Sequence, residues 1–260
     1  MIRILEGDCL ALLPTIEAGS VRLAFADPPY NIGVDYGPGE KADRLPPAEY
    51  YAWCRRWIGE AARLLTPDGS LWILINHERA ARVEVMLEDA GLAMRDWITW
   101  YESFGVNCST KFNRTSRRLL HAVRDPKRFV FHRGPVSRPS DRQAKYGDKR
   151  AAPGGKVWDD VWGINPAIPR VCGTFRERIP EFPTQLPLQL LRAVIGCASD
   201  PGDLVLDPFS GSGTTAHAAA ELGRRFIGVE KSPVFAKRSR SRVSTLLRTP
   251  PCGVTPAMPS

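Results

Sequence analysis

Residues 21–32, VRLAFADPPYNI, join a short apolar run directly to an acid and two prolines. The first six residues favour β-structure and carry large apolar side chains at every second position, which predicts a strand in the middle of a sheet. Asp27 stands at the predicted carboxyl end of this strand. Pro28 and Pro29 have a fixed φ and no N–H, so no helix can begin there. The chain therefore turns at a rigid corner directly after the strand.

This corner combines hydrogen-bond acceptors with a flat aromatic ring. A planar ring with an exocyclic amino group fits it, with N–H groups bonded to the Asp27 carboxylate and the Pro28 carbonyl and its face against Tyr30. A strand-ending acid that caps the next helix, followed by prolines that stop the chain, explains the four letters D-P-P-Y equally well. A second motif has to decide between these interpretations.

The composition is that of a globular protein with one main domain. The 260 residues are 43% hydrophobic and 25% charged, which suffices for a full core. The apolar runs are too short to span a bilayer, and acids at positions 6 and 8 argue against a secretory signal. Six scattered cysteines without a CxxC pair predict reduced thiols and no metal site. We therefore expect a cytoplasmic protein with no membrane segment.

Positive charge is concentrated in two segments. The formal net charge is +8, but residues 111–150 carry a net +10 and residues 224–248 a net +7, which leaves the rest of the chain at −9. Such local charge favours a nucleic-acid partner, and an Arg-rich solvated surface is the alternative.

Hydrophobic periodicity predicts an alternation of strands and helices. Strands are expected at residues 2–5, 21–26, 70–75, 96–101, 119–123, 128–131, 204–206 and 226–229. Helices are expected at residues 48–65, 79–90, 186–198, 214–222 and 233–247, with a short helix or turn at 11–16. Gly, Pro and charged residues in 31–46 predict a mobile loop that acts as a lid or substrate loop. The long stretch 132–183 lacks periodicity and is expected to be a functional loop, partly ordered by Trp158, Trp162 and Phe175.

The second motif, DPFSGSGTTAHAAAELGRRFIGVEKSP, begins at Asp207 and predicts a βαβ unit with a glycine-rich first turn. An acid at the tip of the second strand, Glu230, is in the position that commonly bonds ribose hydroxyls. No lysine follows Gly213, which excludes a nucleotide P-loop. The G-S-G-T-T-A spacing only approximates a dinucleotide site, so S-adenosylmethionine, which has no phosphate, is the best fit.

With both motifs in view, the chain resembles the amino-methyltransferases of DNA, in particular the β group, whose D-P-P-Y precedes the cofactor loop. The matching motifs are D-P-P-Y at 27–30, F-P-T-Q-L-P at 182–187, a variant of H-P-T-Q-K-P, and D-P-F-S-G-S-G-T-T at 207–215, with Gly7-Asp8 at the start. Phe182 and Leu186 replace the family's His and Lys, which puts only contacts of those side chains in doubt. The resemblance implies an α/β, circularly permuted, Rossmann-like S-adenosylmethionine-dependent methyltransferase fold with a basic DNA-recognition insertion.

The resemblance also implies a division of the chain. It gives residues 1–131 as a catalytic half, 132–181 as a target-recognition insertion, 182–249 as a cofactor-binding half and 250–260 as a C-terminal tail.

Site residues follow from the same resemblance. The implied catalytic residues are Asp27, Pro28, Pro29 and Tyr30. The implied cofactor-binding residues are Asp8, Thr184, Gln185, Asp207, Phe209, Gly211, Gly213, Thr214, Thr215 and Glu230. Among them Asp207 is expected to orient the methionine ammonium and Glu230 to bind the ribose, while Gly211 and Gly213 let the backbone approach the cofactor.

The implied reaction is methyl transfer from S-adenosylmethionine to N6 of adenine in double-stranded DNA, with the base flipped out of the duplex. N4 of cytosine is the alternative target. Adenine is favoured because D-P-P-Y resembles the N6-adenine enzymes, whereas the N4-cytosine enzymes more often have Ser at the position of Asp27. More distant alternatives are a protein glutamine methyltransferase and a non-catalytic DNA-binding module that kept the fold. The resemblance allows a homodimer and a cognate restriction endonuclease as further partners.

Overall fold

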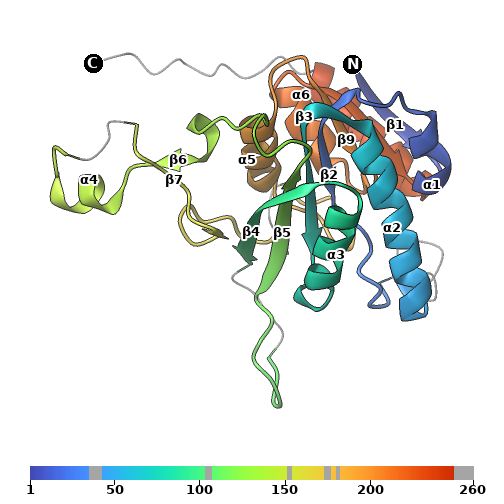
Figure 1. Ribbon diagram of the computed structural model, residues 1–260, viewed down its shortest axis with the longest axis horizontal. Helices are drawn as coiled ribbons and strands as arrows, with labels where there is room; N and C mark the ends of the chain where they lie inside the picture. The colour runs from blue at the N-terminus through green and yellow to red at the C-terminus, as the bar shows by residue number, and fades with distance from the viewer. Residues whose placement is uncertain (35–42, 103–106, 151–153, 173–176, 180–181, 249–260) are drawn as a thin grey trace.

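The computed structural model contains one eight-stranded sheet between two layers of helices (Figure 1). It describes residues 1–34, 43–102, 107–150, 154–172, 177–179 and 182–248. The strand order is β1-β10-β9-β2-β3-β5-β4-β8. The strands are β1 (Ile2–Glu6), β2 (Val21–Ala26), β3 (Leu65–Ile75), β4 (Ala93–Tyr101), β5 (Ser116–Val123), β8 (Val161–Trp162), β9 (Leu204–Asp207) and β10 (Arg225–Glu230). The first five strands of that order are parallel, and β5 runs antiparallel between β3 and β4.

Helices bury both faces of the sheet. One face is covered by α1 (Cys9–Leu12), α2 (Pro47–Leu64) and α3 (His77–Asp89). The other face is covered by α5 (Leu188–Ala198), α6 (Thr214–Glu221) and α7 (Pro233–Arg248). Within the part of the chain that the structure describes, no helix combines the length and the apolar character needed to cross a bilayer. The predicted α/β, Rossmann-like fold is confirmed.

Strand β2 lies in the middle of the sheet, as its sequence predicts. Val21 and Ala24 pack into the core under α2 and α3, whereas Leu23 and Phe25 pack into the core under α5 and α6. Because successive side chains of a strand point to opposite faces, a strand buried on both sides needs apolar residues at almost every position.

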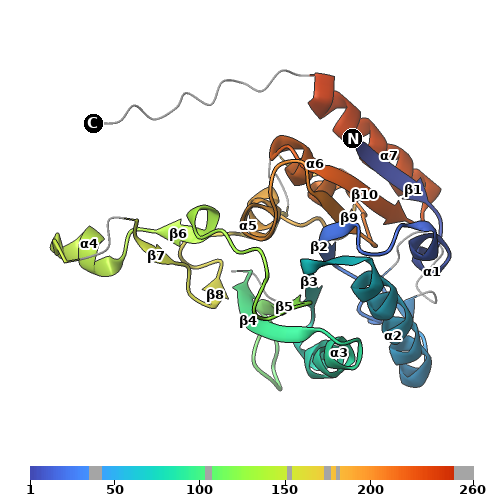
Figure 2. The ribbon, with the colours of Figure 1, turned by 45° about the horizontal axis from the view of Figure 1, so that its top comes forward.

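The first strand completes the half of the sheet that is built by the end of the chain. β1 pairs in parallel with β10, and Arg240 of α7 donates to the carbonyl of Ile4 at 3.0 Å. The N-terminus consequently lies beside α7 (Figure 2). This arrangement is the one expected of a permuted chain, in which β1 takes the place of the strand that would follow α7.

Two predicted elements differ in the structure. Residues 128–131 form no strand, because their backbone makes only isolated contacts such as the bond from Val130 N to Asp68 O at 3.3 Å. Strand β3 begins at Leu65 and not at residue 70, where the predicted strand begins. The additional residues, which include Pro67-Asp68-Gly69, are accommodated by a shift in register against β2.

Part of the predicted insertion projects from the body as an arm, which we define as residues 133–160 (Figure 1). It contains a 3-10 turn, Gly134–Val136, the two-stranded ribbon of β6 (Ser137–Arg138) and β7 (Lys156–Val157), and the short helix α4 (Asp141–Tyr146). The chain then returns to the body, where β8 pairs with β4 and Trp162 is buried in the core. Residues 132–181 are therefore only partly separate from the sheet. Phe175 and the tail 250–260 lie outside the described residues.

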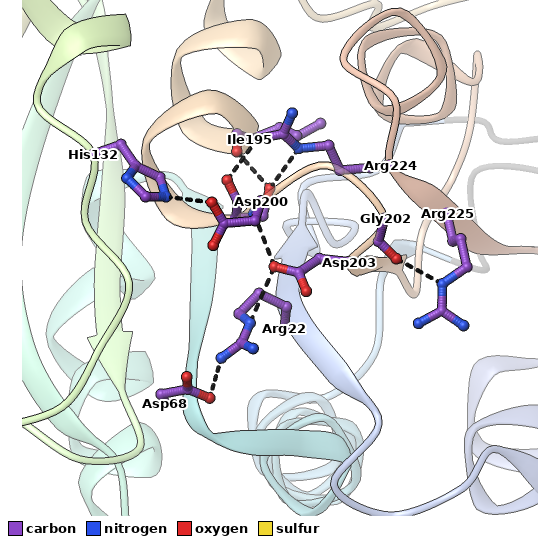
Figure 3. Close-up of polar contacts among 10 residues, drawn as sticks. Arg22, Asp68, His132, Ile195, Asp200, Gly202, Asp203, Arg224 and Arg225 are labelled. Atoms are coloured by element: carbon purple, nitrogen blue, oxygen red, sulfur yellow. Dashed lines mark hydrogen bonds and ion pairs between the residues drawn. The ribbon is translucent and has the colours of Figure 1, made fainter.

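A network of ion pairs and hydrogen bonds lies at the amino ends of the parallel strands (Figure 3). Arg22 of β2 pairs with Asp68 and, at 3.1 Å, with Asp203 just before β9. Asp200 accepts from His132 at 2.9 Å. Because His132 stands directly before the arm, this network fixes the arm's start to the loop that leads into β9.

Candidate active site

Parallel pairing of β2 with β9 brings the two sequence motifs together. Leu23 pairs with Val205 and Ala24 with Leu206, so Asp27 and Asp207 stand at the carboxyl ends of neighbouring strands. The two carboxylates are close enough that the charge of Asp27 helps to raise the pKa of Asp207. Glu230, at the end of β10, completes an acidic edge. In open parallel sheets, ligands bind at this edge where the strand order reverses.

Hydrogen bonds fix the D-P-P-Y corner. The Tyr30 hydroxyl donates to the Asp27 carboxylate at 2.5 Å, and the Tyr50 hydroxyl of α2 donates to the Pro29 carbonyl at 2.9 Å. Burial raises the pKa of Asp27, and the charge of Arg117 opposes that rise. The corner thus holds a desolvated carboxylate beside an aromatic ring whose position is set by its own hydroxyl.

Two charged residues behind the corner were not predicted from the sequence. Arg117 of β5 donates to Glu102 at 2.6 Å and to the Tyr30 hydroxyl at 3.3 Å, and it lies 3.9 Å from Asp27. Glu102 follows β4 directly and is 7% exposed. Arg117 belongs to a basic run that composition alone assigns to DNA, so the sequence contains no local signal of its burial.

Hydrogen bonds join the two described ends of the loop that follows the corner. The buried Asp43 carboxylate accepts four backbone N–H bonds of 2.9 to 3.1 Å, from Asn31, Ile32, Gly33 and Val34. Asn31 adopts φ +60° and exchanges two hydrogen bonds with the backbone of Leu45. These hydrogen bonds hold residues 31–34 beside residues 43–45, at the two described ends of the predicted loop over 31–46. Residues 35–42 lie outside the described residues, and the role of the loop as a lid or substrate loop stays a prediction.

Both acids of the second motif hold the glycine-rich turn. Asp207 accepts from the backbone N–H of Phe209 at 2.9 Å and from the Thr215 hydroxyl at 2.5 Å. Glu230 accepts from the N–H of Gly211 at 2.9 Å and of Ser232 at 2.8 Å. Burial raises the pKa of Asp207 to about 7, with contributions from the charges of Asp27 and Glu230. The carboxylates are buried beside one another and therefore favour a cation.

Both glycines of the turn have left-handed φ values, and a side chain at each would meet a different neighbour. Gly211 has φ +48°, and a Cβ there would come within 2.8 Å of the Phe182 ring. Gly213 has φ +73°, and a Cβ there would collide with Ser239 of α7. The absence of a side chain at Gly213 is therefore required for the packing of α7, whether or not the backbone there also approaches the cofactor.

The other predicted cofactor residues have structural contacts of their own. Thr214 accepts from Arg242 at 3.1 Å, and Gln185 bonds the backbone of Glu177 and Ile179. The Phe209 ring packs on the Trp57 ring with 5.1 Å between the ring centroids, and the Asp8 side chain caps α1. Thr184 is half-buried. Their cofactor roles stay predictions.

Asn76 is a further polar residue at this edge that the motifs did not predict. It follows β3 directly, is 9% exposed, and neither atom of its side-chain amide has a hydrogen-bond partner. The signal was available, since Asn76 ends the apolar run LWILI just as Asp27 and Asp207 end theirs. Unpartnered buried amides usually find a ligand or water.

The DNA methylase family matches residues 21–240 of the chain, which include both motifs and the strands that carry them. The chain belongs to this family. The DNA adenine methyltransferase YhdJ of Escherichia coli K12 is 33% identical over 260 aligned residues, covering 92% of this chain and 82% of YhdJ. The predicted resemblance to DNA amino-methyltransferases is thereby confirmed.

Two solved structures share the fold of this DNA methylase. The M1.HpyAVI–SAM complex superimposes with a TM-score of 0.66 at 21% identity, covering 94% of this chain and 99% of that one. The cytosine-N4-specific PvuII DNA methyltransferase superimposes with a TM-score of 0.71 at 18% identity, covering 93% and 86%.

The packing of Gly213 yields a prediction about stability. Gly213→Ala is expected to lower the free energy of unfolding by about 2 to 4 kcal/mol, because strain at positive φ adds to the collision with Ser239. Gly19→Ala is the matched control, since Gly19 has φ +67° with nothing within 4 Å of the added Cβ, and it should cost about 1 kcal/mol. Urea unfolding of the two variants measures the difference. Equal losses would show that α7 does not constrain the turn.

Proposed function

We propose that this methylase transfers a methyl group from S-adenosylmethionine to N6 of adenine in double-stranded DNA. One observation carries the proposal: the half-buried Asp27 corner lies beside Asp207, which ends the adjacent parallel strand β9, and Glu230 ends β10, the next strand of the sheet. One motif supplies acceptors for an amino group, and the other supplies carboxylates for a cationic cofactor. An enzyme acting on chromosomal DNA would work in the cytoplasm, at the nucleoid.

The residues of the acidic edge fit this cofactor. S-adenosylmethionine carries positive charge on its sulfonium and ammonium groups, and Asp27, Asp207 and Glu230 are three carboxylates whose pKa values burial raises. A bound cation relieves the repulsion among them. Asn76 adds an amide without a partner at the same edge. Asp207 and Glu230 would hold the cofactor, with the backbone of the glycine-rich turn against it.

In the proposed reaction the cofactor supplies an electrophilic methyl group on a good leaving group. The Asp27 carboxylate and the Pro28 carbonyl accept hydrogen bonds from the two N–H groups of the flipped base's amino group. These hydrogen bonds orient the lone pair of the amino nitrogen. Tyr30 offers its ring to the face of the base while its hydroxyl holds Asp27. Since no side chain forms a bond to the base, these residues act by position and electrostatics.

Adenine is favoured over cytosine on two grounds. The D-P-P-Y corner resembles the N6-adenine enzymes, and YhdJ, which is 33% identical, is named a DNA adenine methyltransferase. PvuII, named as cytosine-N4-specific, shares the fold at 18% identity. The proposed partner is DNA alone, and no feature of the described residues argues for the homodimer or the restriction endonuclease.

Asp27→Asn tests the catalytic corner. Loss of a charged acceptor in the transition state should cost about 2 to 4 kcal/mol, or roughly 30- to 1000-fold in the single-turnover rate. Cofactor affinity should stay nearly intact, because Asp207 and Glu230 would still hold the cofactor. Asp200→Asn is the matched control, because Asp200 lies at the opposite edge of the sheet and is half exposed. Nucleoside analysis of the methylated DNA identifies the product. A wild-type rate in Asp27→Asn would remove the assignment, and N4-methylcytosine as the product would favour the alternative target.

Cofactor binding should depend on pH through Asp207. A bound cation lowers the pKa of a neighbouring carboxyl, so binding releases the proton that Asp207 carries below its pKa of about 7. Affinity should therefore rise as the pH increases from 5.5 to 7.0, by about tenfold if the bound carboxyl stays ionised throughout. Calorimetric titration at the two pH values measures this change. Asp207→Asn should bind more weakly and lose most of the pH dependence, and a dependence equal to that of the wild type would place the titrating group elsewhere.

We further propose that the arm reads the DNA sequence. It projects from the body, and it carries seven Lys or Arg against four Asp, with Tyr146 of α4 79% exposed. Several of its arginines pair within the arm, as Arg138 does with Asp159 at 2.9 Å, which orders the arm but reduces its free charge. Sequence is read by contacts to base edges, whereas phosphate contacts only position the protein.

Exchanging residues 137–157 for the corresponding segment of a related enzyme should change the methylated sequence and leave cofactor affinity unchanged. These limits spare β8, whose Trp162 belongs to the core. Methylation-sensitive sequencing of cellular DNA reads the outcome. If a folded, cofactor-binding chimera still methylates the original sequence, recognition lies outside the arm, and the loop between residues 31 and 46 becomes the next candidate.

A further inference from the structure

Four side chains from three separate segments form a single hydrogen-bonded chain behind the target corner. Its members, in order, are Glu102, Arg117, Tyr30 and Asp27. We propose that Arg117 is a positioning residue, which aims the Tyr30 hydroxyl at Asp27 and keeps that carboxylate in the form that receives the target amino group. The inference rests on the proposed role of Asp27 in methyl transfer.

The chemistry of the groups fixes the direction of every bond in this chain. A guanidinium group donates and cannot accept, so Arg117 donates both to Glu102 at 2.6 Å and to the Tyr30 oxygen at 3.3 Å. The single hydroxyl proton of Tyr30 is then directed to Asp27 at 2.5 Å. One oxygen of Asp27 is occupied by this bond. The second oxygen, 3.9 Å from Arg117 without a direct hydrogen bond, is left to accept from a substrate.

The charges that face Asp27 come from several elements. Arg117 on β5 lowers the pKa of Asp27, and the Tyr30 hydroxyl bond lowers it as well. Glu102 after β4 and burial itself raise it, and Asp207 on β9 is a further acid within electrostatic range. Arg117 is thus the cation that offsets burial and two neighbouring carboxylates. Without it, Asp27 would hold a proton at a higher pH and would lose one of its acceptor sites.

The surroundings of Arg117 require a guanidinium rather than any cation. Its side chain is 11% exposed, and its central carbon lies 5.1 Å from the Trp100 ring centroid and 5.9 Å from that of Tyr30. Trp100 is its cross-strand partner on β4. A planar group can contact two rings and donate in two directions at once, whereas an ammonium group on a flexible stem cannot reproduce that set of contacts.

Single-turnover rates measured against pH, at saturating DNA and cofactor, test the inference. Arg117→Met should move the acid limb of the profile to higher pH by about one pH unit, as expected for the loss of a nearby opposite charge. At a pH that lies on the acid limb of both enzymes, the rate should therefore fall about tenfold more than the rate at pH 9. Arg117→Lys keeps the charge, so its acid limb should stay near that of the wild type while the rate falls at every pH.

Glu102→Gln should shift the acid limb of the pH–rate profile in the opposite direction. Removing this acid should move the acid limb to lower pH, because Glu102 raises the pKa of Asp27. A merely structural role would lower the rate without moving the limb in either variant. Melting temperature and cofactor titration establish that each variant is folded. If Arg117→Met does not fold, the limbs of Glu102→Gln and Arg117→Lys decide the matter by themselves.

Coincident acid limbs in the wild type, Arg117→Met and Glu102→Gln would overturn the inference. Asp27→Asn in the same assay separates this failure from failure of the proposed function. An inactive Asp27→Asn together with unmoved limbs removes the role of Arg117 only. An Asp27→Asn enzyme with the wild-type rate removes the catalytic corner itself.

Discussion

The parallel pairing of β2 with β9 is the contact on which the site depends. The two strands are separated by about 180 residues of sequence, yet they exchange backbone hydrogen bonds at Leu23–Val205 and Ala24–Leu206. Because both strands run in the same direction, the acids at their carboxyl ends, Asp27 and Asp207, lie next to each other on the same side of the sheet. A corner that accepts an amino group and a turn that favours a cation are thereby placed side by side.

Charge is arranged differently at the two edges of the sheet. Where the strands begin, Arg22 pairs with both Asp68 and Asp203, and Asp200 accepts a hydrogen bond from His132 (Figure 3). Where the strands end, Asp27, Asp207 and Glu230 accumulate negative charge, and Arg117 is shared between Glu102 and the target corner. The first arrangement stabilises the fold. The second leaves unfavourable repulsion that a cationic ligand removes, which is the usual condition of a binding site.

Local sequence predicts what is specified locally. Asp27 and Asp207 follow apolar runs, so their places at strand ends could be inferred, and the βαβ unit around the glycine-rich turn follows from its spacing. Arg117 could not be inferred, because its burial depends on the register in which β4 and β5 pair across a long hairpin. Gly213 could be identified as a turn residue, but the side chain that excludes a Cβ there, Ser239, lies on α7. Residues 128–131 have the composition of a strand without a neighbouring strand to pair with.

Asp43 and Asn31 join the two ends of one excursion of the chain. The Asp43 carboxylate accepts hydrogen bonds from four backbone N–H groups, and two further hydrogen bonds join Asn31 to Leu45. These six bonds hold the two ends together and involve no residue between 35 and 42. The entropy of closing a loop grows only slowly with its length. Residues 35–42 can therefore be lengthened, shortened or replaced at little thermodynamic cost to the D-P-P-Y corner.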